Sequence, residues 1–132
     1  MKRLVAGLLI AGSMLRVAPT LMAHHGTNAS YDPTKKVTLN GIITNFTWRN
    51  PHAFVEFDVT DDKGVTVHWV GEMNSPGVLK AAGWTSTTLK PGDRVTLTVN
   101  PSRAGTAVGV IDRGQPVFVN GKQALGTGDN QN

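Results

Sequence analysis

Short runs of alternating apolar and polar residues, separated by turn signals, cover most of the chain after residue 36. In "AFVEFDV", residues 53–59, apolar side chains occupy every second position, and Glu56 and Asp58 lie between them. This alternation predicts a strand with one buried and one exposed face. Similar runs recur in "KVTLNGIITNFTW", "VTVHWVGEM", "LKPGDRVTLTV", "TAVGVIDRG" and "QPVFVNGKQAL". The pattern therefore predicts five or six short strands.

The first of these runs changes its pattern at a glycine. Leu39 and the valine two residues before it share one face, whereas Ile42, Phe46 and Trp48 follow with the opposite parity. A change of parity at Gly41 indicates a β-bulge or a sharp bend, which a strand needs when it curls around a small barrel. We therefore expect Ile42 to point inward.

Glycine-containing turns connect the strands, and one helix interrupts them. "DDKG" at 61–64 predicts a hairpin turn, "PG" at 91–92 suits a type II turn, and "NGK" at 120–122 is typical of a two-residue hairpin. "NSPGVLKAAGW", residues 74–84, has a serine N-cap, a proline at the first helical position, an apolar stripe that includes Val78, and a terminating glycine. A short helix is therefore expected between the third and fourth strands.

These elements predict an all-β fold with one short helix, arranged as a small antiparallel five- or six-stranded barrel of the OB type. The barrel should occupy residues 36–125 as a single domain, because 132 residues hold one modest core. Residues 24–35 are polar and contain turn formers, so we expect an extended N-terminal arm before the barrel. Residues 126–132, "GTGDNQN", contain no large apolar side chain and predict a disordered tail.

Residues 1–23 have the features of a signal peptide. Lys2 and Arg3 precede the apolar run "LVAGLLIAGSML", and the small residue Ala23 ends the segment. Arg16 interrupts the apolar stretch before the roughly 20 residues that a membrane span requires. We therefore expect cleavage after Ala23, a periplasmic or secreted protein, and no membrane span in the mature chain.

Removal of the leader changes the charge of the protein. The full chain has 13 basic and 9 acidic residues and a net charge of +4. Three of the basic residues and none of the acidic ones lie in the leader, which leaves 10 against 9 and a net charge of +1. A nearly neutral surface gives no electrostatic basis for binding nucleic acid, so no nucleic-acid partner is expected.

The chain has no cysteine and none of the common catalytic motifs. Disulfides, thiolate metal sites, cysteine nucleophiles and lipid-modified cysteines are therefore excluded. The sequence contains no G-x-S-x-G, no phosphate-binding loop and no H-E-x-x-H. We therefore expect a binding module that has no catalytic residues and takes a metal ion or another small ligand.

Two adjacent histidines would begin the mature chain. The α-amino group and imidazole of His24 could chelate one metal ion, since a free α-amino group has a pKa of roughly 8. His25 adds a second imidazole, and His52, in the "NPH" turn, could add a third from one end of the barrel. Such nitrogen ligands favour Cu(II), with Zn(II) and Ni(II) behind it. The alternative is a solvated arm, with His52 bonding a backbone carbonyl within its turn.

Three tryptophans indicate a different class of function. Trp48, Trp69 and Trp84 could stack a sugar or aromatic ligand, which would make the protein a carbohydrate- or protein-binding domain without metal. Alternatively, at least two of them pack in the core, and Trp69 is the clearest case because it shares a face with Val65 and Val67. A copper-dependent oxidoreductase is a third alternative, and it would need an open position for substrate.

Two further polar residues receive structural interpretations. His68 faces outward on its strand, so we expect a surface histidine. It shares a face with Glu72, but four strand residues span about 13 Å, too far for both to bind one metal ion. Glu72 is expected to cap the first turn of the helix near Ser75.

Four stretches carry motifs that are specific in combination: "HHGTNASYD", "VTLNGIITNFTWRNPHAFVEFDV", "WVGEMNSPGVLKAAGW" and "LKPGDRVTL". Together they resemble an uncharacterised family of small exported proteins of Gram-negative bacteria, a domain of unknown function. Its members have a mature N-terminal His-His pair, a W-x-N-P-H-A segment, and E-x-x-S-P and GW before a KPGD turn. Here these motifs begin at His24, Trp48, Glu72, Gly83 and Lys90. The resemblance implies export and architecture, and it brings no established activity.

Overall fold

The computed structural model describes residues 27–124 of the chain. The expected signal peptide, the His24–His25 pair and the tail at 126–132 lie outside the described residues. The elements of the described part are, in order, α1 (Thr27–Ser30), β1 (Val37–Thr47), β2 (Phe54–Thr60), β3 (Thr66–Glu72), α2 (Pro76–Ala81), β4 (Arg94–Pro101), β5 (Val108–Ile111), β6 (Phe118–Val119) and β7 (Lys122–Gln123). Neither helix among them is long and apolar enough to cross a membrane.

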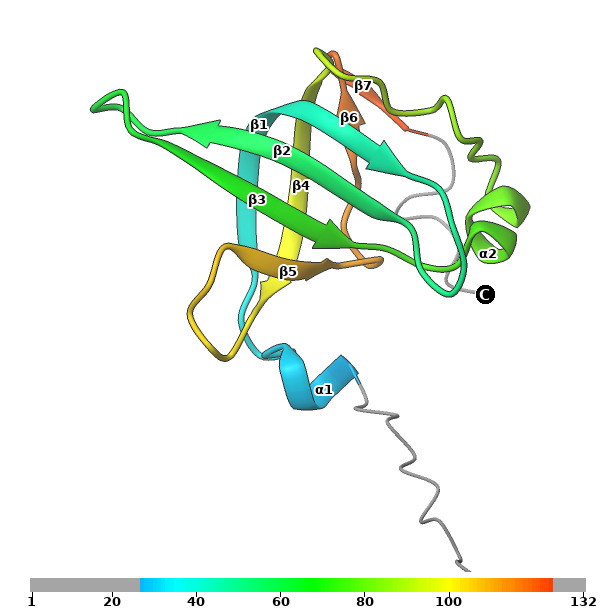
Figure 1. Ribbon diagram of the computed structural model, residues 1–132, viewed down its shortest axis with the longest axis horizontal. Coiled ribbons are helices and arrows are strands. Elements are labelled where there is room, and N and C mark those ends of the chain that lie inside the picture. The colour runs from blue at the N-terminus through cyan, green and yellow to red at the C-terminus, as the bar shows by residue number, and fades with distance from the viewer. Residues whose placement is uncertain (1–26, 125–132) are drawn as a thin grey trace, which may run out of the picture.

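Five of these strands close into a barrel (Figure 1). Neighbouring strands pair in the order β1-β2-β3-β5-β4, and β4 pairs again with β1. The two short strands β6 and β7 extend the sheet beyond β4. The expected all-β barrel of the OB type, with a short helix between β3 and β4, is therefore confirmed. One detail differs, because β5 lies parallel to β3 whereas the other pairs are antiparallel.

The long strand β1 closes the barrel, because it pairs with β4 along one part of its length and with β2 along the other. Its residues 37–42 pair with β4, and its residues 42–47 pair with β2. Gly41 lies where β1 passes from one neighbour to the other, and a Cβ atom there would lie 2.7 Å from the backbone oxygen of Asp58 on β2. The absence of a side chain at Gly41 therefore allows β1 and β2 to approach closely where the barrel curls.

The parity of β1 changes at a bulge and not at Gly41. The register with β2 shifts between Ile43 and Asn45. Before the bulge, Leu39 and Ile43 are buried, whereas Ile42 is 41% exposed. The expectation that Ile42 points inward is therefore wrong, because alternation continues unchanged through Gly41 and breaks two residues later.

The core fills the barrel and continues beneath α2. Its hydrophobic members are Leu39, Ile43, Ala53, Val55, Phe57, Met73, Leu79, Trp84, Leu89, Val95, Leu97, Val99, Ile111 and Val117. Trp84 is 2% exposed and is the largest fully buried side chain. Trp48 and Trp69 are half-buried and pack against this core. Trp69 therefore faces inward as expected, but Trp84 is the tryptophan at the centre.

The helix α2 forms as its flanking residues predict. Pro76 occupies the first position, and Ser75 Oγ accepts a hydrogen bond of 3.4 Å from the N–H of Val78. Gly83, with a φ of 87°, follows the last turn. Leu79 is buried, whereas Val78 is 51% exposed. The apolar stripe is therefore narrower than expected, because a helix of six residues presents few positions to the core.

The three turns predicted from glycine are also present. Gly64, Gly92 and Gly121 have φ values of 80°, 93° and 79°, and Asn120 has a φ of 51°. Positive φ at both Asn120 and Gly121 is what a type I′ hairpin requires. The turn residues therefore set the strand connections locally.

The arm before the barrel is folded against it. Residues 27–30 form the short helix α1. The N–H of Asp32 then donates a hydrogen bond of 2.9 Å to the oxygen of Pro101, and Tyr31 forms a bridge with Ser102. The expectation of an extended arm is therefore wrong for the described residues, because their backbone finds partners at the end of β4.

The hairpin of β2 and β3 extends beyond the barrel (Figure 1). β5 pairs with β3 from Val70 onward, so the outer end of the hairpin, residues 65–69, has β2 as its one partner strand among the described residues. Val65 and Val67 are 56% and 44% exposed. Their parity matches that of Trp69, but the core does not extend beneath them.

Candidate functional site

Three side chains from distant parts of the chain meet at one end of the barrel. Tyr31 follows α1, His52 lies between β1 and β2, and Glu72 ends β3. Tyr31 Oη donates a hydrogen bond of 2.7 Å to Glu72 Oε2, and His52 Nδ1 contacts Glu72 Oε1. Both carboxylate oxygens of Glu72 therefore have a partner. We call this group the Tyr31–Glu72–His52 cluster.

The backbone directly after β3 holds the segment that carries His52. The N–H of Met73 donates to the oxygen of Ala53 at 2.8 Å, and the N–H of Ala53 donates to the oxygen of Asn74 at 3.1 Å. Ala53 is fully buried. Since successive side chains of an extended chain point to opposite sides, His52 points outward, toward Glu72.

Tyr31 is a firm hydrogen-bond donor to the cluster. Burial raises the pKa of the Tyr31 hydroxyl above its ordinary value, and the hydrogen bond to Glu72 and the charge of Glu72 raise it further. Tyr31 therefore keeps its proton at physiological pH. Its contact with Glu72 fixes the end of the arm to the same carboxylate that holds His52.

The contact with Glu72 decides which nitrogen of His52 can bind a ligand. The His52 side chain is 44% exposed and that of Glu72 is 17% exposed. If Nδ1 carries the proton and donates to the carboxylate, Nε2 presents its lone pair. Metal-bound histidines in proteins commonly have this arrangement, in which a carboxylate holds the nitrogen that does not bind the metal.

The described residues do not complete a metal site. Residues 27–124 contain no group of three histidine, cysteine or acidic side chains that could hold a metal ion. Of the three expected ligands, His52 lies within this range, and His24 and His25 lie outside it. A copper site therefore depends on ligands from the segment that precedes α1.

Two structural interpretations made from the sequence are wrong. His52 bonds the carboxylate of Glu72 and not a backbone carbonyl. Glu72 does not cap α2, since Ser75 Oγ accepts the hydrogen bond from the first turn of that helix. The partners of Glu72 lie 20 and 41 residues away in the sequence, so no local pattern indicates them.

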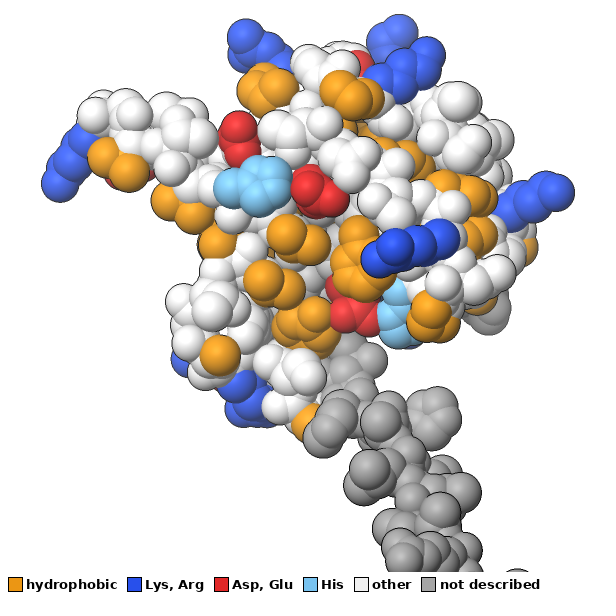
Figure 2. Space-filling view, viewed as in Figure 1, with side chains coloured by type: hydrophobic (Ala, Val, Ile, Leu, Met, Phe, Trp, Pro, Cys, Tyr) orange, Lys and Arg blue, Asp and Glu red, His pale blue; other side chains and the backbone are white. Residues whose placement is uncertain are grey.

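A second histidine lies beside acidic side chains on the outer face of β2 and β3. His68 Nδ1 lies 2.7 Å from Asp58 Oδ1, and His68 Nε2 lies 3.5 Å from Glu56 Oε2. Asn45 donates a hydrogen bond of 2.9 Å to Glu56. Figure 2 shows histidine side chains beside acidic side chains on this face, with hydrophobic side chains around them. The His68 side chain is 49% exposed, so the expectation of a surface histidine is confirmed.

We expect the titration of His68 to report this contact. The hydrogen bond that His68 donates to the carboxylate of Asp58 raises the pKa of His68 above the ordinary value of 6.5, and Glu56 adds to the increase. Because the folded pKa is raised, the stabilisation is complete below the unfolded pKa and is lost as the pH rises through the folded pKa. A pH titration of the imidazole followed by NMR should therefore give a midpoint above 6.5.

Replacing Asp58 with asparagine should lower that midpoint. Asp62→Asn is the matched control, since Asp62 is exposed in the turn of the same hairpin and the structure shows no contact between it and His68. An unchanged midpoint in Asp58→Asn would contradict the assignment.

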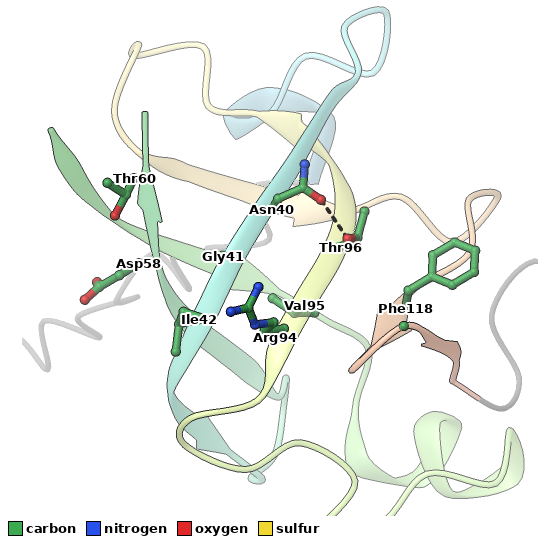
Figure 3. A pocket seen from close by; sticks show the side chains of 10 residues that line it. Asn40, Gly41, Ile42, Asp58, Thr60, Arg94, Val95, Thr96 and Phe118 are labelled. Atoms are coloured by element: carbon green, nitrogen blue, oxygen red, sulfur yellow. Dashed lines mark hydrogen bonds between the residues drawn. The ribbon is translucent and has the colours of Figure 1, made fainter. Parts of the chain in front are cut away.

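A shallow groove of about 380 Å³ lies elsewhere, across β1, β2 and β4 (Figure 3). It is lined by Asn40, Gly41, Ile42, Asp58, Thr60, Arg94, Val95, Thr96, Phe118 and Gly121. Among these lining residues, Thr96 Oγ1 donates a hydrogen bond of 2.6 Å to Asn40 Oδ1. One arginine, Arg94, and one aromatic residue, Phe118, line the groove, and no group of three metal-ligating side chains lies among the described residues.

The tryptophans do not form a common exposed platform. Trp84 is buried, and Trp48 and Trp69 are half-buried against the core. Phe46 packs against Trp48 with ring centroids 5.7 Å apart in an edge-on arrangement. The expectation that at least two tryptophans serve packing agrees with these positions.

The fold and the cluster define a small OB-type barrel that carries a tyrosine–carboxylate–histidine group at one end. Residues 13–113 match the Family of unknown function (DUF6152), and the chain belongs to this family. No curated protein matches the sequence.

Among solved structures, the chain is similar to the mitochondrial single-stranded DNA binding protein Rim1 from S. cerevisiae. The two share 13% identity with a TM-score of 0.47, over 68% of this chain and 97% of that one. At this identity the likeness concerns the fold, and no ligand follows from it.

Proposed function

We propose that this protein is an exported, periplasmic module that binds Cu(II) near the Tyr31–Glu72–His52 cluster. The ligands are the α-amino group and imidazole of His24, the imidazole of His25, and Nε2 of His52. The α-amino group becomes available when the signal peptide is removed after Ala23. Nitrogen ligands of this kind place copper ahead of the other divalent metals.

The observation that carries the proposal is the contact between His52 and Glu72. The carboxylate holds Nδ1, which leaves Nε2 as the ring nitrogen that can bind a metal ion. Carboxylate partners of metal-bound histidines strengthen the ligand and fix its tautomer. His52 therefore has the support that a metal ligand needs before any metal binds.

The position of Tyr31 makes the other ligands available. Tyr31 is bound to the same carboxylate as His52, and His25 precedes Tyr31 by six residues. Six residues span at most about 20 Å, so the tether between His25 and the cluster is short. The short tether raises the local concentration of the amino-terminal ligands at that imidazole.

The test compares copper titrations of two histidine variants of the mature protein. His52→Ala should weaken Cu(II) binding at least about tenfold, because it removes a supported ligand. His68→Ala is the matched control, since both side chains are about half exposed and both contact a carboxylate. Equal affinities in the two variants would overturn the role of His52.

The amino-terminal ligand is tested in the same titration. Intact mass of the protein isolated from the periplasm should first show that it begins at His24. One extra residue before His24 should then lower the affinity for copper and change the visible spectrum of the complex. Equal affinity and equal spectra with and without the extra residue would reject the α-amino group as a ligand.

A further inference from the structure

The outer end of β3 has a free edge that the rest of the barrel does not cover. Residues 66–72 pair with β2 on one side, but β5 pairs on the other side from Val70 onward. The N–H of Val70 donates to the oxygen of Ala107 at 3.0 Å, so the backbone groups of Val70 face β5. Backbone groups alternate in direction along a strand, so those of Thr66 and His68 face the same side and meet no strand among the described residues.

The side chains along this edge form a symmetric pattern. "VTVHW", residues 65–69, reads apolar, polar, apolar, polar, apolar in both directions, with Val67 at the centre. Val65 and Val67 are 56% and 44% exposed. The pattern therefore places an apolar row on one face of a free strand, which is the arrangement that favours pairing with another strand.

The edge also lacks the features that usually prevent such pairing. Natural proteins protect sheet edges from pairing with other strands in several ways. They place charged side chains, most often lysine, or a proline on the edge strand, or they keep that strand very short. The other edge of the sheet, β7, has two residues, one of which is Lys122. Residues 65–69 contain no lysine, no proline and no acidic residue. In contrast to β7, the edge of β3 therefore carries none of these protecting residues.

We propose that the edge at residues 65–69 pairs antiparallel with the same edge of a second copy of this chain. A two-fold axis at Val67 would place Val67 opposite Val67 of the second copy and Val65 opposite Trp69 of that copy. Thr66 and His68 would exchange backbone hydrogen bonds across the axis, which matches the direction of their free groups. The apolar row of each copy then covers that of the other.

The charges along the edge are compatible with this pairing. His68 is the one titratable residue in the segment and would lie beside Thr66 of the second copy, so no like charges meet. Asp58 and Glu56 hold the imidazole of His68 from its own copy. A strand contact of this length is smaller than a standard interface, so the dimer should be weak, with a Kd of about 100 µM.

Sedimentation of the purified protein over a range of concentrations tests the proposal. The wild-type protein should form dimers at about 100 µM. Val67→Lys should raise the Kd at least about tenfold, since it brings two like charges together at the axis. Val78→Lys is the matched control, because Val78 is an exposed valine on α2. A wild-type protein that stays monomeric at about 1 mM, or an equal effect of both variants, would overturn the proposal.

A second measurement fixes the register of the pair. The chain has no cysteine, so Val67→Cys introduces one thiol. Directly opposed residues in a non-hydrogen-bonded antiparallel pair have Cα atoms about 4.5 Å apart, within the range of a disulfide. Mild oxidation should therefore link Val67→Cys into a covalent dimer much faster than Val78→Cys. Equal rates would reject the two-fold axis at Val67.

Discussion

Replacing Trp84 with alanine should lower the free energy of unfolding by about 3–5 kcal/mol. Trp84 is 2% exposed and is the largest fully buried side chain. Its backbone N–H donates to the oxygen of Leu79 at 2.9 Å, a bond that alanine retains, so the loss comes from the side chain. Truncation would leave a cavity between the helix and the barrel that neighbouring side chains fill incompletely.

Denaturant unfolding followed by circular dichroism measures this loss. Trp48→Ala is the matched control, because Trp48 is half-buried at the edge of the same core and should cost less. An equal loss of stability in the two variants would contradict the central position of Trp84.

Replacing Gly41 with alanine should destabilise the barrel by about 1–3 kcal/mol. The added Cβ would lie 2.7 Å from the backbone oxygen of Asp58 and 2.9 Å from a ring carbon of Phe57. The oxygen belongs to β2, so relief requires moving the strand that β1 pairs with. The loss of stability arises from this clash between β1 and β2. It should appear as a lower denaturant concentration at the midpoint of unfolding.

Gly77→Ala provides the control for this variant. Gly77 lies in α2, and the nearest atom to its added Cβ, Ser75 Oγ, is 4.0 Å away. Alanine is favoured over glycine in a helix by up to about 1 kcal/mol, so this variant should be neutral or more stable. If both variants change stability in the same direction and by the same amount, the steric argument for Gly41 is wrong.

Local features of the fold could be predicted because they depend on neighbouring residues. Gly64, Gly92 and Gly121 specify their turns by positive φ, and Ser75 with Pro76 specifies the start of α2. These signals need no knowledge of distant parts of the chain. Together with the alternation they were sufficient to predict the class of barrel.

Features that depend on distant packing were not predictable in the same way. The face of Ile42 depends on a bulge that forms against β2, and alternation alone does not locate it. How much of Trp69 is buried depends on how far the hairpin extends beyond the core. Its position in the alternating pattern predicts only which face of the strand it lies on. Trp84 is buried because it packs into the core together with Leu79 of α2, and no local pattern shows that contact.

The candidate site was predicted in part. His52 was identified from its turn, but its partners Glu72 and Tyr31 were not. Their contacts join β3 and the arm to the segment between β1 and β2, and such pairings have no signal in a single sequence. The signals in the sequence were a tyrosine in the polar arm and an acidic residue at the end of a predicted strand, and neither indicates a contact with His52.

The closure of the barrel through β1 has a consequence for the timing of folding. Residues 37–42 pair with residues 94–99, which lie 52 to 62 residues later in the chain. A chain that emerges from the ribosome N-terminus first cannot complete its first strand until β4 has been synthesised. Ordering so long an intervening stretch also carries an entropy cost that delays folding. The nascent polypeptide therefore remains open until β4 has left the ribosome, after most of the chain has been translated.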